Sequence, residues 1–229
     1  VMSNERRSRI RRFALLVTAC AAVLAAAAHA QDYPTKPVRI IIGFPPGGAT
    51  DLVARLLAPK FSEALKQQVI VDNRTGANGV IGTDYVAKAA PDGHTLLLGT
   101  LAAMVISPAI GKVPYDSFKD FTPIGRTVAL QNIFIVHPTL PVRSLKELIA
   151  LAKARPGALN YASSGTGSTG HLSGELFKSM SGTNIVHVPY KGGGPALTDL
   201  IAGHVEIFVA IISTAIPHVK SGKARALAV

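Results

Sequence analysis

The sequence predicts an α/β fold in which parallel strands alternate with helices. β-branched runs such as residues 38–44 (VRIIIGF) end in loops rich in glycine and proline, and each loop leads into a helical segment. The order strand, helix, strand, helix, strand over residues 38–99 is typical of a parallel sheet with crossover helices. The same order starts again after Pro138, so the pattern indicates two groups of elements.

The first group is expected to consist of strands at residues 38–44, 68–73 and 95–99 and helices at residues 52–65 and 80–89. Thr50 or Asp51 is the expected N-cap of the first helix. That helix has Leu52, Leu56 and Leu57 on one face. An irregular stretch at residues 111–123 then ends the group.

The second group begins with a long apolar run at residues 126–136, which we interpret as a strand that crosses between domains. Ser144 is the expected N-cap of the next helix, and Glu147 stands at capping-box spacing from it. The elements expected here are strands at residues 159–163, 185–188, 205–211 and 225–229 and helices at residues 144–155, 171–180, 195–202 and 214–221. Because the last strand has no turn after it, we expect the natural protein to continue.

The first thirty residues have the pattern of a secretory signal peptide. Residues 5–12 are basic, residues 14–28 are apolar, and Ala28 and Ala30 are the small residues that a signal peptidase reads. The apolar run is shorter than the ~20 residues that a membrane span needs. We therefore expect cleavage after Ala30 and export, with a lipid anchor on Cys20 as the alternative.

Composition excludes several classes of protein. The 24 Lys and Arg against 13 Asp and Glu give a net charge of +11, which falls to +7 once the five Arg and one Glu of residues 1–30 are removed. The one Cys goes with them, so no disulfide is expected. The basic residues are scattered among few aromatics, which predicts no nucleic-acid partner. The histidines lack metal-ligand spacing, so no metal site is predicted.

Two glycine-rich loops, residues 44–51 and 163–171, each stand between a strand and a helix. Backbone N–H groups in such loops, together with the positive end of the following helix, suit an anion such as a carboxylate. Either loop alone is compatible with an ordinary tight turn, but the pair favours a binding site. Residues 165–170 also fit G-x-G-x-x-G, but the next strand has no acidic residue for a ribose, so no cofactor is predicted.

The loop at residues 44–51 (FPPGGATD) resembles the opening loop of the Bug (TctC-like) extracytoplasmic solute receptors of tripartite tricarboxylate transporters. Further segments of the chain resemble that family in order and at family spacing. They are YPTKPVRIII at 33–42, DNRTGANGVIGTDYVAKAAPDGHTLL at 72–97, YASSGTGSTGHLSGELF at 161–177 and VPYKGGGPALTDLIAGHVE at 188–206, with PHVKSGKARALAV at the end.

The resemblance implies a two-lobed periplasmic-binding-protein type II-like fold without the C-terminal part of lobe one. Residues 1–30 would be the signal peptide, residues 31–130 lobe one and residues 131–229 lobe two. It further implies a monomeric periplasmic receptor, with no catalysis and no cofactor, that captures a small carboxylate and delivers it to transporter membrane subunits.

The resemblance implies that the ligand lies between the two loops and is held largely by backbone amides. The ligand-binding residues implied in this way are Phe44, Pro46, Gly47, Gly48, Ala49, Thr50, Asp51, Asn78, Ser163, Ser164, Gly165, Gly167, Ser168, Thr169, His171 and Tyr190.

One departure from the family pattern concerns the ligand's charge. Many relatives have a polar or acidic residue after the strand at 205–209, where it can contact an amine, but here residues 208–212 read FVAII. The expected ligand is therefore a carboxylate without an ammonium group. Two alternative functions remain at this point: a ligand sensor for a signalling receptor, and an exported hydrolase that uses Ser168 or Ser164 with His171.

Overall fold

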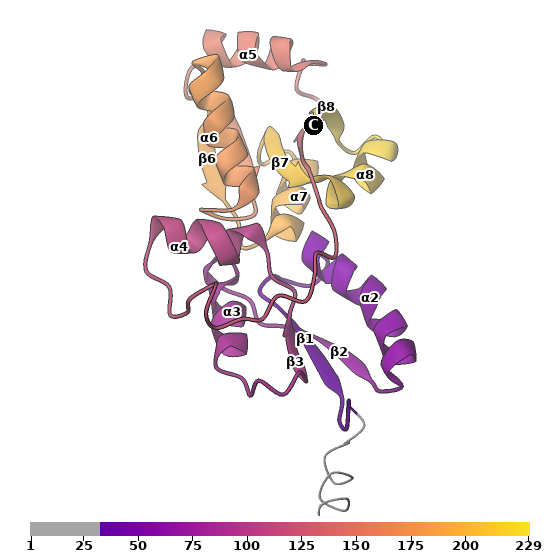
Figure 1. Ribbon diagram of the computed structural model, residues 1–229. Helices are drawn as coiled ribbons and strands as arrows, with labels where there is room; N and C mark the ends of the chain where they lie inside the picture. The colour runs from indigo at the N-terminus through magenta and orange to yellow at the C-terminus, as the bar shows by residue number, and fades with distance from the viewer. Residues whose placement is uncertain (1–32) are drawn as a thin grey trace, which may run out of the picture. The chain divides into compact units, whose positions relative to one another are not determined.

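The computed structural model describes residues 33–229, so the predicted signal peptide and Cys20 lie outside the described residues. Residues 37–229 form one unit, which contains two sheets (Figure 1). In the described part of the chain, no helix has the length and apolar character that a membrane crossing requires.

The first sheet is parallel throughout, with the strand order β2-β1-β3. Its strands are β1 (Val38–Ile42), β2 (Val69–Asn73) and β3 (Thr95–Leu97). The helical segments around it are α2 (Ala49–Leu65), a 3-10 turn at Ala77–Gly79, α3 (Val80–Ala87), and a π-helical turn at Ala102–Ile106 that continues into α4 (Ser107–Ile110). The central strand β1 is almost entirely buried, as its β-branched sequence predicts.

The second sheet is mixed, with the strand order β6-β5-β7-β4-β8. Strand β5 is parallel to β6 and β7, whereas β4 is antiparallel to β7 and β8. Its strands are β4 (Asn132–Val136), β5 (Asn160–Ser163), β6 (Val186–Pro189), β7 (Ile207–Ile211) and β8 (Arg225–Ala228). Its helices are α5 (Leu145–Ala154), α6 (Thr169–Ser181), α7 (Gly193–Ala202) and α8 (Ile212–Lys220).

The start of α5 confirms the predicted N-cap, because the Ser144 hydroxyl accepts a hydrogen bond from the Glu147 amide at 3.2 Å. The Glu147 carboxylate in turn accepts from the amide of Arg143 at 2.6 Å. Two side-chain acceptors therefore satisfy donors at this helix start.

The start of α2 differs from the prediction. The helix begins at Ala49 after an N-cap at Gly48, so neither Thr50 nor Asp51 is the cap. Its buried residues include Ala54 and Ala58, whereas Leu52 and Leu56 are exposed. The small alanines allow the helix to approach the sheet closely, which a count of leucines does not reveal.

The predicted strand at 126–136 is also shorter than expected. Only Asn132–Val136 forms a strand, because this is the part that pairs with β7 and β8. Residues 121–131 have no regular secondary structure in the described chain and connect the two sheets. The helical segment from Ala102 to Ile110 was not anticipated from the sequence.

Helix α6 lies close to its sheet because small residues face the sheet. Tyr161, on β5, is fully buried, and a Cβ atom on Gly174 would lie 2.2 Å from its ring. The aromatic ring thus occupies the space that a side chain at position 174 would need.

We expect Gly174→Ala to lower the free energy of unfolding by about 1–3 kcal/mol through overpacking. This loss of stability should appear even though alanine normally stabilises a helix by roughly 1 kcal/mol relative to glycine. Denaturant unfolding followed by circular dichroism measures it. Gly194→Ala in α7 is the matched control, because nothing lies within 4 Å of the added Cβ. Equal stability of the two variants would contradict the packing argument.

Candidate functional site

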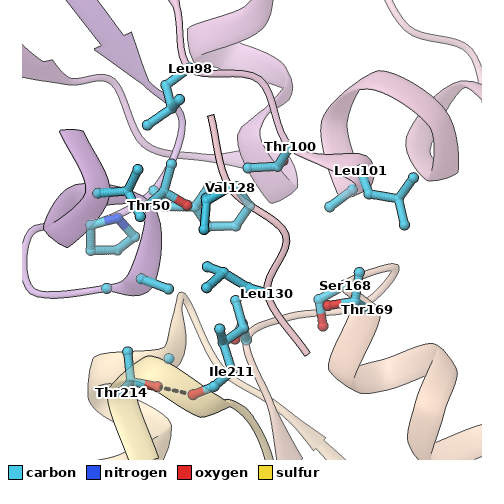
Figure 2. Close-up of a pocket in the computed structure, with 18 of the residues that line it drawn as sticks. Thr50, Leu98, Thr100, Leu101, Val128, Leu130, Ser168, Thr169, Ile211 and Thr214 are labelled. Atoms are coloured by element: carbon cyan, nitrogen blue, oxygen red, sulfur yellow. Dashed lines mark hydrogen bonds between the residues drawn. The ribbon is translucent and has the colours of Figure 1, made fainter. Parts of the chain in front are cut away.

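A cavity of about 250 Å³ is lined by residues from the β1–β3 part of the chain, from the β4–β8 part, and from the connection between them (Figure 2). The lining residues are Phe44, Pro45, Gly48, Ala49, Thr50, Val53, Leu98, Gly99, Thr100, Leu101, Ala102, Thr127, Val128, Leu130, Ser164, Ser168, Thr169, Gly193, Gly194, Ile211 and Thr214.

Four helices begin at this cavity. Its lining includes the first residues or N-caps of α2 (Gly48, Ala49, Thr50), α6 (Ser168, Thr169), α7 (Gly193, Gly194) and α8 (Ile211, Thr214). The N–H groups of a first helical turn have no partner within the helix, and each helix start carries a partial positive charge. The backbone therefore makes this cavity favourable for an anion.

None of the lining residues has a charged side chain. Hydroxyl groups come from both parts of the chain, as Thr50, Thr100, Ser168, Thr169 and Thr214 show in Figure 2. Between them lie the aliphatic side chains of Val53, Leu98, Leu101, Val128, Leu130 and Ile211. The cavity thus combines hydrogen-bond donors with an apolar wall. Among residues 33–229, no cluster of His, Cys, Asp or Glu could hold a metal ion.

Asp51 holds the first loop from behind. Its buried carboxylate accepts hydrogen bonds from the Gly47 amide at 3.0 Å, the Arg55 guanidinium at 2.9 Å and the Asn73 amide at 3.0 Å. Burial opposes ionisation of Asp51, but these hydrogen bonds outweigh it and lower the pKa of the carboxyl. Asn73 also donates to the Phe44 carbonyl at 3.0 Å, so the whole turn is fixed to β2.

Ser163, at the end of β5, holds the second loop. Its fully buried hydroxyl lies 3.1 Å from the Gly165 carbonyl, 3.2 Å from the Gly165 amide and 2.7 Å from Nε2 of His187. Ser168 is the N-cap of α6, and its hydroxyl accepts the His171 amide at 3.2 Å. This places Ser164, Ser168 and Thr169 at the cavity.

The cavity gathers part of the predicted binding set. Phe44, Gly48, Ala49, Thr50, Ser164, Ser168 and Thr169 line it. The other predicted residues are not among the lining residues: Pro46, Gly47, Asp51, Asn78, Ser163, Gly165, Gly167, His171 and Tyr190. For Asp51 and Ser163, the reason is that the side chain bonds the loop from behind instead of reaching through it.

The side chains of three more of these predicted residues contact other groups of the protein and do not line the cavity. Tyr190 donates to the Asp199 carboxylate at 2.7 Å, and burial together with this hydrogen bond raises the pKa of Tyr190 to about 12. The side-chain amide of Asn78 is buried without a hydrogen-bond partner among the described residues, next to Gly167. His171 accepts a hydrogen bond from the Gly167 amide at 3.1 Å.

Several lining residues were not anticipated. Gly193 and Gly194 belong to a third glycine loop, KGGG at 191–194, whose position before a helix was a usable signal. Val53, Leu98, Leu101, Val128 and Leu130 are ordinary apolar residues, and no local pattern separates them from core residues.

The chain is similar to proteins of a known family. A model of the tripartite tricarboxylate transporter family receptor matches residues 53–229. Protein BugT of Bordetella pertussis is 42% identical over 211 residues, which cover 90% of this chain and 64% of BugT. The chain thus spans less than two thirds of the length of that relative.

Solved structures are also similar to this chain. The periplasmic binding protein BugD has a TM-score of 0.77 at 34% identity, with 85% of this chain and 65% of BugD covered. A Rhodopseudomonas palustris protein solved with adipate has a TM-score of 0.78 at 39% identity, with 85% of this chain and 66% of that chain covered. These similarities confirm the predicted α/β fold of the periplasmic-binding class.

We expect Asp51→Asn to lower the free energy of unfolding by about 1–3 kcal/mol, because three donors lose a charged acceptor. The pKa of Asp51 lies below its ordinary value of 3.8. The carboxylate therefore stabilises the fold above that value, and its contribution is lost as the pH falls through the folded-state pKa. The variant should lack this part of the acid destabilisation in thermal melts. Glu63→Gln, at an exposed position of the same helix, is the control, and equal losses in both variants would contradict the assignment.

Proposed function

Because the chain belongs to the tripartite tricarboxylate transporter receptor family, we propose that it is an extracytoplasmic receptor that captures a small carboxylate in this cavity. The family is one of receptors and not of enzymes. The observation that carries the proposal is a cavity without charged side chains onto which four helix N-termini open.

The charge of the cavity supports an anionic ligand. Each helix start carries a partial positive charge, and the four starts at the cavity have the same sign. No cationic side chain contributes to the lining. A mono- or dicarboxylate matches this backbone charge, whereas a cationic or zwitterionic ligand would leave its ammonium group without a counter-charge.

The wall supports a ligand with an aliphatic body. Leu98, Leu101, Val128, Leu130 and Ile211 provide apolar surface, and a volume of about 250 Å³ limits the ligand to a small molecule. Ile211 belongs to the segment where the family resemblance implies a polar or acidic residue in many relatives. The solved R. palustris relative was determined with adipate, a dicarboxylate with an aliphatic body.

The serines of the second loop support binding and not hydrolysis. The Ser168 hydroxyl accepts the His171 amide, and Nδ1 of His171 accepts the Gly167 amide. The other nearby imidazole, His187, contacts the buried Ser163. In the described part of the chain, neither ring is hydrogen-bonded to Ser164 or Ser168, so no nucleophile–base pair is formed at the cavity.

Location and delivery complete the proposal. The basic, apolar and small-residue pattern of residues 1–30 supports export to the periplasm, and the relative BugD is a periplasmic binding protein. We infer that the receptor acts as a monomer and passes its carboxylate to the membrane subunits of a transporter. Such coupling requires that the ligand binds one conformation better than another.

We expect a dicarboxylate from the series succinate, glutarate and adipate to raise the melting temperature of the full-length mature protein. At a concentration of 100 times its dissociation constant, a ligand stabilises the native state by about 2.7 kcal/mol. Differential scanning fluorimetry measures the shift, with aspartate, glutamate and neutral sugars as comparison ligands. Stabilisation by sugars alone, or preferentially by aspartate or glutamate, would contradict the proposed ligand class.

We expect Ile211→Asp to weaken dicarboxylate binding at least tenfold, because it places a negative charge in a cavity that lacks a cationic side chain. Ile211→Leu is the matched control and should retain affinity within a few fold. Isothermal titration calorimetry measures both variants. If Ile211→Asp bound as tightly as the wild type, this cavity would not be the site.

A further inference from the structure

Two histidines from different elements lie stacked behind the second loop. His187 is on β6 and His171 is in the first turn of α6, and their ring centroids are 4.1 Å apart with an interplanar angle of 27°. Neither residue lines the cavity. Each ring is connected by hydrogen bonds to one glycine of the loop that carries Ser164, Ser168 and Thr169.

The connection of His187 runs through Ser163. The Ser163 hydroxyl has one hydrogen, and the Gly165 carbonyl and Nε2 of His187 are both within reach. The hydroxyl donates to the Gly165 carbonyl when Nε2 carries its proton, and it donates to Nε2 in the other tautomer. In either tautomer the Ser163 hydroxyl links His187 to Gly165, because it also accepts the Gly165 amide at 3.2 Å.

The connection of His171 is direct. Its Nδ1 accepts the hydrogen bond from the Gly167 amide at 3.1 Å, so that nitrogen must be unprotonated. Gly167 has a φ of 80°, and the turn has a hydrogen bond from the Ser168 amide to the Gly165 carbonyl at 3.1 Å. A neutral His171 thus holds one end of this turn, and the pair His187 and Ser163 holds the other.

We propose that His171 and His187 are positioning residues for the anion-binding loop, and that carboxylate affinity requires His171 to remain neutral. This inference rests on the function proposed above. A protonated His171 would aim an N–H group from Nδ1 at the Gly167 N–H group. Two donors would then face each other, the turn would move, and the backbone amides at the start of α6 would lose their alignment on the cavity.

Several charged and titratable groups surround the pair of histidines. Burial first, and then a positive charge on His171, lower the pKa of His187 to about 4. Glu175 and Lys178 on α6 and Tyr161 on β5 complete the surroundings: Tyr161 donates to Glu175 at 2.7 Å, and Lys178 pairs with Glu175 at 2.9 Å. Glu175 favours and Lys178 opposes a protonated His187. Of the two rings, His171 is the one whose nitrogen accepts a hydrogen bond from a backbone amide of the loop, so a proton on that nitrogen would break the contact.

The sign of the pH dependence separates this role from simple electrostatics. A new positive charge on His171 near an anion site would by itself strengthen carboxylate binding in acid. Loss of the Gly167 hydrogen bond would weaken it. A fall in affinity on acidification therefore reports the position of the loop and not the charge of the imidazole.

The test is the affinity of the tightest-binding member of the series succinate, glutarate and adipate, measured by calorimetry at about pH 8 and again at about pH 5. We expect roughly a tenfold loss for the wild-type protein. His171→Asn keeps an acceptor near the position of Nδ1 but cannot be protonated, so its affinity should not change with pH. His187→Leu should bind more weakly at both pH values, and His187→Gln, which retains a donor for Ser163, should recover most of the loss.

A second readout does not depend on a ligand. In the wild-type protein the amide resonance of Gly167 should shift with pH in NMR spectra, and in His171→Asn it should not. Three results would each overturn the proposal. The Gly167 resonance could stay unchanged with pH, the wild-type affinity could stay the same or rise in acid, or the affinity of His171→Asn could change with pH as much as that of the wild type. A pH-dependent Gly167 resonance without binding of any of the three dicarboxylates would leave the loop assignment supported and the proposed function contradicted.

Discussion

The proposed carboxylate site depends on one constraint: backbone N–H groups must stay aimed at the cavity, because no lining residue has a charged side chain that could attract an anion. A flexible arginine can follow a ligand, whereas a backbone amide stays where its helix places it. Anion binding by amides is therefore only as good as the rigidity of the turns that precede the helices. Most of the polar network around the cavity serves that rigidity and does not reach the cavity itself.

The two main loops meet this requirement by different chemistry. Asp51 holds the first loop with a carboxylate that accepts three hydrogen bonds. A carboxylate facing the ligand would repel it, but Asp51 is buried and paired with Arg55. The second loop is held by a hydroxyl and two imidazoles, which carry no permanent charge. The first anchor is therefore insensitive to mild acid, and the second depends on histidine chemistry.

Much of the fold could be predicted from the sequence, because the local patterns and the tertiary structure agree. The run VRIII gave the central strand, and Ser144 gave a helix start, since both depend on short-range rules. The face of α2 could not be predicted, because the alanines that allow close packing against the sheet look unremarkable beside its leucines. The part of the predicted strand at residues 126–131 does not form, for a related reason: an apolar run becomes a strand only where another strand is available to pair with it.

Part of the cavity lining could also be predicted from the sequence. Glycine loops before helices indicated Gly48, Ser164 and Ser168, which line the cavity. The positions of the Asp51 and His171 side chains could not be predicted, because which side of a loop a side chain occupies is decided by distant strands. The aliphatic wall left no local signal, since Leu98 and Leu130 acquire their role only when segments far apart in the chain are brought together.

The connection between the sheets has a consequence for how occupancy could be sensed. The segment that joins the two sheets has no regular secondary structure, and its residues Thr127, Val128 and Leu130 form part of the cavity wall. Figure 2 shows Val128 and Leu130 at the cavity. A molecule in the cavity would therefore touch the segment that joins the two sheets, with no other element between the ligand and that connection.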